Sequence, residues 1–122
     1  MKNYEDLVVW KKAFKPACEI YEITSNFPIE EKFGLSDQMR RSAVSIPSNI
    51  AGGSGRGFDK QYVQFLGVAR GSCNELETQI LISAKNKYIT PEESLRLQSS
   101  CNEILKMLSA FIETLKNNNH SY

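Results

Sequence analysis

The side chains best suited to chemistry in this sequence are four cations in its first half. Arg40, Arg41 and Arg56 lie within residues 38–58, a segment without a single acidic side chain, and Lys60 follows it closely. A guanidinium group presents several donors in a planar fork that suits a carboxylate or a phosphate. We therefore predict that these residues bind the phosphate backbone of RNA or DNA.

Two other roles for the same cations stay open. Because Arg40 and Arg41 are adjacent, they point about 100° apart on a helix and cannot face one partner closely. Either could form an ion pair with Asp37, three or four residues away, or with an acid of a neighbouring copy of the chain. A solvated side chain in a glycine-rich turn is the alternative for Arg56.

Catalytic chemistry has little support in the sequence. His120 is the only histidine and lies near the end of a polar tail, so a serine or cysteine nucleophile would lack a positioned base. The glycine-rich loop at residues 52–57 follows an expected helix instead of a strand and fits no nucleotide-binding motif. No Glu-x-x-His pair is present for a di-metal helical site. We predict that the chain is not an enzyme and has no cofactor and no metal.

Length and composition describe one globular domain. The chain has 122 residues, of which 41% are hydrophobic and 24% charged, and its net charge is only +1. Its start is not a secretory signal, and no apolar run is long enough to span a membrane, so we expect a cytoplasmic protein without a membrane partner. The three cysteines, Cys18, Cys73 and Cys101, lack a CxxC spacing, and we expect them to be buried thiols.

Apolar residues recur at steps of three and four in four segments, which predicts four helices. The expected helices run from about Tyr4 to Ser25, from Glu30 or Glu31 to Gly52, from Asp59 to about Lys87, and from Thr90 to Lys116. Short connections favour antiparallel neighbours. The fold class predicted is all-α, an up-down-up-down antiparallel four-helix bundle at residues 1–116 with a flexible polar tail at 117–122.

Several residues within these helices call for a local explanation. Pro16 and Pro47 interrupt apolar stripes that continue past them, so we expect bends without breaks. Asn49 lies close to the stripe and needs hydrogen-bond partners if it is buried. Gly67 and Gly71 are four apart and weaken a helix, so we expect another helix, in this chain or in a second copy, to approach there closely.

Thr90, Pro91 and Glu93 predict the start of the last helix. Thr90 can accept a hydrogen bond from the Glu93 backbone, Pro91 suits the first helical position, and the Glu93 carboxylate can reach back to Thr90.

Four pieces of the sequence resemble a known family. They are LVVWKKA (residues 7–13), IYEIT followed by FP (20–24 and 27–28), GLSDQMRRSAVSIPSNIAGGSGRG (34–57) and GSCNELETQI (71–80). The chain resembles the four-helix-bundle proteins encoded by intervening sequences in bacterial 23S ribosomal RNA genes. The resemblance implies an up-down bundle that assembles as a homopentamer. The family usually has an acid after Ile-Ala, where this chain has Gly52.

A related protein extends what the resemblance implies about partners. The accessory variability determinant of diversity-generating retroelements is a pentamer that binds nucleic acid and a reverse transcriptase. Our first hypothesis is therefore a non-enzymatic homo-oligomer that binds RNA or DNA through Arg40, Arg41, Arg56 and Lys60 repeated around an axis. The alternative is a structural adaptor that binds a protein partner, such as a reverse transcriptase, and uses its arginines in self-assembly.

Overall fold

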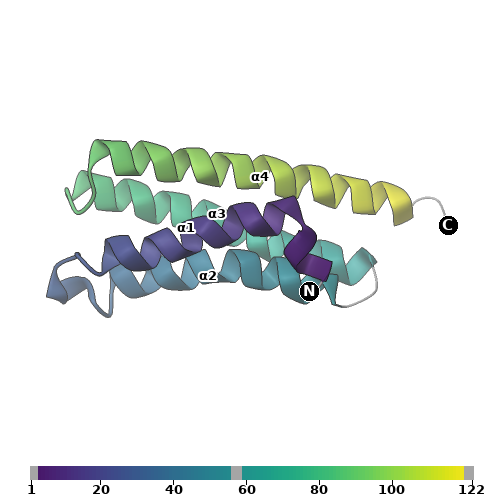
Figure 1. Cartoon of the computed structure of the whole chain (residues 1–122), viewed down its shortest axis with the longest axis horizontal. Coiled ribbons are helices and arrows are strands. Elements are labelled where there is room, and N and C mark those ends of the chain that lie inside the picture. The colour runs from purple at the N-terminus through teal and green to yellow at the C-terminus, as the bar shows by residue number, and fades with distance from the viewer. Residues whose placement is uncertain (1–2, 56–58, 120–122) are drawn as a thin grey trace.

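The computed structural model of the chain describes residues 3–55 and 59–119, and its regular elements there are all helical (Figure 1). They are the 3₁₀ helix η1 (Asn3–Asp6), α1 (Val8–Thr24), the 3₁₀ helix η2 (Ile29–Glu31), α2 (Leu35–Ser54), α3 (Asp59–Lys85) and α4 (Pro91–Asn119). The predicted all-α class and the number of long helices are confirmed. No long helix within the described residues is apolar enough to cross a membrane.

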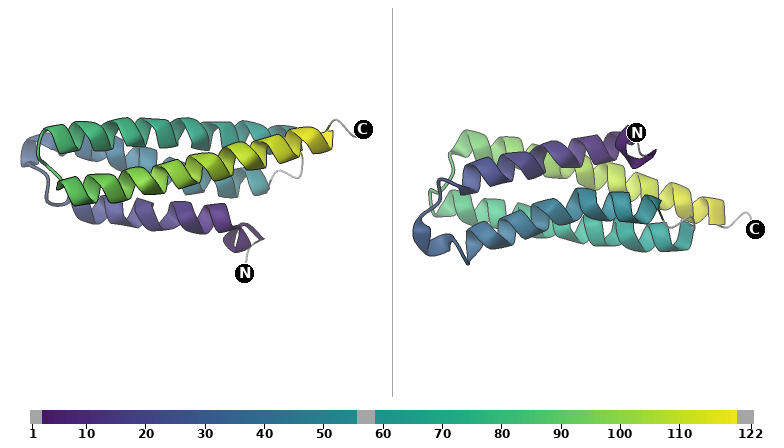
Figure 2. Two further views of the ribbon diagram at one scale, coloured as in Figure 1. Left: turned by 90° about the horizontal axis from the view of Figure 1, so that it is seen from above. Right: turned by 60° about the horizontal axis from the view of Figure 1, so that its bottom comes forward.

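The four long helices run up, down, up and down along one axis. Figure 1 shows α1 and α2 joined at the end of the bundle that also holds the turn between α3 and α4, and Figure 2 shows the same alternation from two other sides. Successive long helices lie antiparallel, joined by short links at residues 55–58 and 86–90 and by a longer one at 25–34 that contains η2 (Figure 1). The described ends of η1 and α4 therefore lie toward the same end of the bundle (Figure 1).

The core is drawn from all four long helices. On α2, α3 and α4 it uses the positions that periodicity indicates, but on α1 the expected burial of Phe14 and Tyr21 is wrong, because both are 49% exposed. The large side chains with less than 2% exposure are Ile20 of α1, Met39, Ile46 and Ile50 of α2, Leu66, Leu76 and Ile80 of α3, and Leu97, Ile104 and Leu108 of α4. Burial of one such side chain stabilises a fold by roughly 1.5–3 kcal/mol. This shared core is what holds the helices together.

The beginning of α2 differs from the prediction. The expected start at Glu30 or Glu31 is wrong, because those residues belong to η2 and α2 begins only at Leu35. Gly34, with φ −112° and ψ −112°, separates the two helices. The Leu35 N–H donates to Glu31 Oε1 at 3.2 Å, so the Glu31 carboxylate satisfies a free donor of the first turn.

The same carboxylate ties this loop to the turn between α3 and α4, which lies at the same end of the bundle (Figure 1). The Tyr88 hydroxyl donates to Glu31 Oε2 at 3.1 Å, and the Phe27 and Tyr88 rings lie 5.2 Å apart. Glu31 therefore fixes the start of α2 and the turn between α3 and α4 together.

The outer ends of α1 and α4 also differ from the expected bounds. Leu7 is extended, with φ −72° and ψ 127°, so η1 and α1 replace one helix from Tyr4. At the other end, α4 continues to Asn119, three residues beyond Lys116 and into the segment expected to be a tail. His120 lies outside the described residues.

The predicted capping box is confirmed, and so is the expectation that neither proline breaks its helix. The Glu93 N–H donates to Thr90 Oγ1 at 3.1 Å and the Thr90 N–H to Glu93 Oε1 at 2.8 Å, which completes the capping box. Pro16 and Pro47 lie inside continuous helices, with both rings buried. The prolines therefore do not end either helix.

The glycines that allow close helix packing are not the predicted ones. A Cβ added at Gly53 would lie 2.7 Å from Tyr62 Cδ1 and 2.8 Å from Phe65 Cβ, so this glycine lets α3 approach α2. A Cβ added at Gly67 or Gly71 would have nothing within 4 Å among the described residues. Within the chain, close packing at Gly67 and Gly71 is therefore wrong, because this side of α3 faces outward.

Candidate functional site

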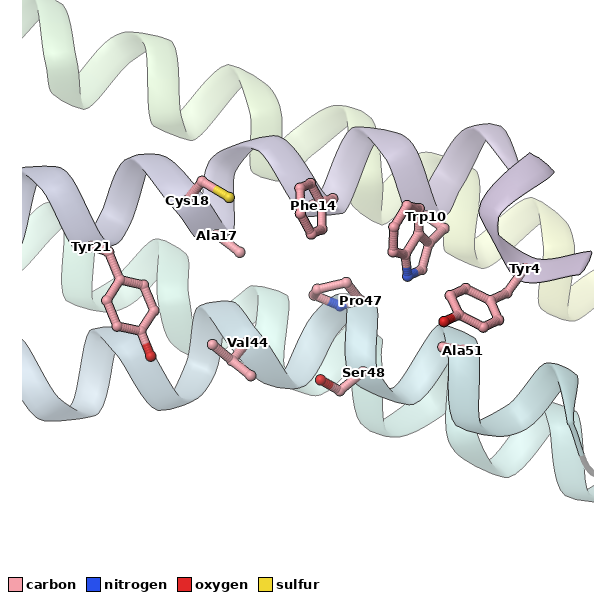
Figure 3. Close-up of a pocket in the computed structure, with 10 residues that line it drawn as sticks. All are labelled: Tyr4, Trp10, Phe14, Ala17, Cys18, Tyr21, Val44, Pro47, Ser48 and Ala51. Carbon is pink, nitrogen blue, oxygen red and sulfur yellow. The ribbon is translucent and has the colours of Figure 1, made fainter. Parts of the chain in front are cut away.

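A groove between α1 and α2 is the most distinctive surface of the described residues. It has a volume of about 340 Å³ and is almost entirely apolar. Its lining residues are Tyr4, Trp10, Phe14, Ala17, Cys18, Tyr21, Val44, Pro47, Ser48 and Ala51. Figure 3 shows aromatic rings from η1 and α1 on one side and small side chains from α2 on the other. Because the α2 side chains are short, they do not fill the space beside the rings.

The aromatic residues of α1 form a row that stabilises itself without closing the groove. The Tyr4 and Trp10 rings meet edge to face at 5.3 Å, and the Trp10 and Phe14 rings stack at 5.0 Å with an angle of 26°. Phe14 and Tyr21 nevertheless remain 49% exposed, and Val44 opposite them is 39% exposed. Contiguous exposed apolar surface is typical of sites that contact another molecule.

One outward stripe of α2 forms the edge of the groove. Its members follow each other at steps of four and three: Asp37, Arg41, Val44, Ser48, Ala51 and Gly55. Arg41, Val44, Ser48 and Gly55 are exposed, and Asp37 and Ala51 are half-buried. Apart from Asp37, the stripe lies within the segment of small residues and arginines that the sequence singled out, so that segment does form a surface.

Arg40 joins α2 to the end of α1. Its Nε donates to Thr24 Oγ1 at 2.8 Å, and its Nη2 is 3.5 Å from the Tyr21 carbonyl oxygen. The guanidinium carbon lies 5.0 Å from the centre of the Tyr21 ring. Thr24 in turn donates to the Ile20 carbonyl at 2.6 Å. The side chain of Arg40 therefore holds two helices together, a role that the sequence did not suggest.

Arg41 forms the ion pair with Asp37 that its spacing allows. Its Nε lies 2.9 Å from Asp37 Oδ2, while the side chain stays 79% exposed. An exposed pair of this kind is worth only about 0.3–0.5 kcal/mol. Arg41 is therefore available to a second, better partner.

The four predicted cations do not form one cluster in a single chain. Lys60 is exposed in the first turn of α3, beyond the far end of α2 from Arg41. The length of α2 from Arg41 to Ser54 alone is about 20 Å at 1.5 Å per residue. Arg56 lies outside the described residues. Any joint action of Arg41 and Lys60 on one ligand therefore needs a ligand or an assembly of that length.

Asn49 and Pro47 occupy opposite sides of α2. Asn49 Nδ2 donates to the Ser45 carbonyl at 2.8 Å and to Ser45 Oγ at 2.9 Å, so the predicted partners exist. Ser72 Oγ of α3 donates to the same Ser45 hydroxyl at 2.8 Å. Asn49 and Ser45 face α3, whereas Pro47 lines the groove toward α1.

The cysteines divide into a buried pair and an exposed residue. The Cys73 thiol donates to the Cys101 carbonyl at 3.4 Å, and the hydrogen bond with Cys73 and burial raise the pKa of the Cys101 thiol. Cys18 is exposed in the groove, so its predicted burial is wrong. Among the described residues, no group of three or more histidine, cysteine or acidic side chains is arranged to hold a metal ion.

The comparisons with known proteins agree on one family. A family model described as 23S rRNA-intervening sequence protein matches residues 5–110. A solved structure of a protein of unknown function from the S23 ribosomal protein family of Bacteroides thetaiotaomicron is similar, with a TM-score of 0.80 and 26% identity. The match covers 86% of this chain and 98% of that one. No curated protein matches the sequence.

Proposed function

Since the chain belongs to the 23S rRNA-intervening sequence protein family, we propose that it is a non-enzymatic homo-oligomer that assembles through the groove between α1 and α2. The observation that carries this proposal is the apolar groove itself, with Phe14, Tyr21 and Val44 left open to water. Five copies is the number that the family resemblance implies.

The chemistry of the groove favours a protein partner of apolar surface. The row of rings and short side chains offers shape and apolar contact, and the described lining residues include no carboxylate, guanidinium or amine. The surface of another helix fits such a groove, because the ridges of side chains on one helix pack into the grooves between those of its neighbours.

Native mass tests the assembly. We expect the wild-type chain to have the mass of several copies, and Val44→Glu to reduce it to one, because the change buries a carboxylate in an apolar contact. The matched control is Leu95→Glu on α4, where a side chain 69% exposed is replaced outside the groove. Far-ultraviolet circular dichroism should stay helical in both variants. A wild-type chain with the mass of one copy at tens of micromolar would contradict the proposal.

Binding to the backbone of RNA or DNA is the second candidate function. The observation in its favour is Lys60, an exposed cation that forms no ion pair within the described residues. An assembly would repeat this cation, and repeated contacts to phosphate raise affinity steeply. The protein adaptor remains the alternative, with the arginines used in assembly.

Fluorescence anisotropy with labelled single-stranded RNA and DNA over a salt series tests the second candidate. We expect affinity to fall as salt rises, and Lys60→Glu to weaken binding at every salt concentration. Lys85→Glu is the matched control, since Lys85 is an exposed lysine at the opposite end of α3. Equal binding by both variants, or no binding at low salt, would remove Lys60 from this role.

A further inference from the structure

We infer that the groove of one copy receives the outer face of α3 from the next copy, with Arg41 of the first opposite Glu75 of the second. This inference rests on the proposed self-assembly and adds which two surfaces meet. It follows from the exposed residues of α3, from their register against α2, and from their charge.

The outer face of α3 carries a stripe with the same spacing as the stripe on α2. Its members, all exposed, follow each other at steps of four and three: Gln64, Val68, Gly71, Glu75, Thr78 and Ile82. Val68 is 54% exposed and Ile82 45%. Two stripes with matching steps on helices of opposite direction can lie along each other.

Gly71 lies in the middle of this stripe and, because it has no side chain, leaves the helix backbone bare there. A Cβ there would have open space around it, so no helix of the same chain explains the glycine. A glycine inside a helix costs about 0.5–1 kcal/mol relative to alanine. Close approach of a helix from another copy would use the bare backbone, and the short side chains of Ser48 and Ala51 line a groove that offers such a helix room.

The contacts between α2 and α3 within one chain set the register. Gly52 lies against Phe65, and Ser45 lies level with Ser72, whose hydroxyls are 2.8 Å apart. Because the two helices are antiparallel, moving one residue toward the N-terminus of α2 corresponds to moving one residue toward the C-terminus of α3.

The exposed stripes of α2 and α3 follow the same register. Arg41, four residues before Ser45, is level with Leu76, so Glu75 is the acid of the α3 stripe beside it. In the same way Val44 is level with Cys73, between Gly71 and Glu75. Ser48 is level with Ala69, next to Val68.

A rotation axis parallel to the bundle keeps every residue at its level. Copies related by such an axis place Arg41 beside the next copy's Glu75, Val44 beside its Gly71 and Ser48 beside its Val68. Glu75 forms no ion pair within the described residues, and Arg41 has only its exposed pair with Asp37. The apolar contacts and the opposite charges therefore coincide in one register.

The two surfaces lie on different faces of the bundle, so the contact is head-to-tail. The groove opens between α1 and α2, whereas the stripe consists of exposed residues of α3, a helix that does not line the groove. A head-to-tail contact closes into a ring when the rotation permits. A contact of groove with groove would instead stop at two copies.

Cysteine cross-linking distinguishes these arrangements. In a Cys18→Ser background, Ser48→Cys and Val68→Cys each leave one exposed thiol, because Cys73 and Cys101 are buried. Co-expressed and oxidised with copper phenanthroline, the two proteins should form covalent dimers on a denaturing gel, and either one alone should not. Co-expression of Ser48→Cys with Asn102→Cys, on the outer face of α4, is the matched control and should give none.

Each contrary result has a separate meaning. Covalent dimers from Ser48→Cys alone would show groove meeting groove and overturn the inference. An assembled native mass without cross-links in the mixture would overturn it while leaving self-assembly intact. A native mass of one copy would overturn self-assembly as well.

A charge exchange tests the Arg41–Glu75 pair directly. Arg41→Glu should weaken association by at least ~10-fold in its dissociation constant, and adding Glu75→Arg to the same chain should restore it. Adding Glu113→Arg, an exposed acid on α4, should not. Equal rescue by both second changes would show that net charge matters and the pair does not.

Discussion

The two sides of α2 are built from similarly small residues, yet one side closes and the other stays open. Toward α3, Gly52 and Gly53 let the Phe65 and Tyr62 rings lie directly on the backbone, and Ser72 bonds to Ser45. Toward α1, Pro47, Ser48 and Ala51 face rings that stack on one another and leave about 340 Å³ open. Small residues therefore permit close packing only where the neighbouring helix presents side chains that reach them.

The contrast assigns the two sides different tasks. Contacts with α3 and the link from Arg40 to α1 should determine the stability of one chain, while the exposed lining of the groove should contribute mainly when another copy is present. Unfolding measurements in the Val44→Glu background, expected to be a single chain, separate these contributions, because assembly adds to apparent stability.

The largest effect is expected at Gly53. Gly53→Ala places a methyl group against Phe65 Cβ, which lies close to the α3 backbone, so the helices must separate. We expect the free energy of unfolding in urea to fall by about 1–3 kcal/mol.

Gly71→Ala is the matched control for Gly53, since its added methyl group meets open space. In the same single-chain background it should raise stability by about 0.5–1 kcal/mol, through helix propensity alone. Equal losses from both changes would mean that the two sides of α3 are packed alike.

The next effect is expected at Arg40, which links α2 to α1. Arg40→Ala removes the hydrogen bond to Thr24 and the stacking on Tyr21, and should lower stability by about 1–2 kcal/mol. Arg40→Lys should recover only part of this, because an ammonium lacks the planar fork. Full recovery of stability by Arg40→Lys would mean that only the positive charge of Arg40 matters in this contact.

A smaller loss is expected at the hydroxyl pair between α2 and α3. Ser72→Ala removes the donor to Ser45 Oγ and should cost about 0.5–1.5 kcal/mol in urea unfolding. Thr78→Ala on the outer stripe should stay within about 0.5 kcal/mol, as surface changes usually do. A larger loss at Thr78 than at Ser72 would reverse the comparison.

The smallest change in single-chain stability is expected at Arg41. Arg41→Gln breaks the exposed pair with Asp37 and should alter the free energy of unfolding by less than about 0.5 kcal/mol. The same change should be clearly visible in the association of the wild-type chain. A loss comparable to that at Arg40 would place Arg41 among the contacts that stabilise one chain.

Periodicity predicted the helices well, because it reports which positions face a core. The four stripes, the capping box at Thr90 and the pairing of Arg41 with Asp37 all depend on residues a few positions apart. The start of α2 was missed because Glu31 reads as a helical acid, while its carboxylate in fact bonds to Leu35 and Tyr88. The second of these partners is 57 residues away.

The candidate surface was predicted only in part, for a related reason. The small residues and arginines of residues 38–58 indicated where a surface would lie, but the rings that complete it come from η1 and α1. Glycine spacing drew attention to Gly67 and Gly71, whereas close packing within the chain occurs at Gly52 and Gly53. Spacing along one helix does not identify the neighbour that each face meets.

Because the groove and the α3 stripe lie on different faces, each copy carries two different contact surfaces, as one unit of a chain of copies does. A copy damaged at one end only, as in Val44→Glu, keeps an intact α3 stripe and would still dock into a sound neighbour. No further copy could then bind in its own groove. A minority of Val44→Glu copies would therefore stop assembly and leave the wild-type copies in rings that do not close.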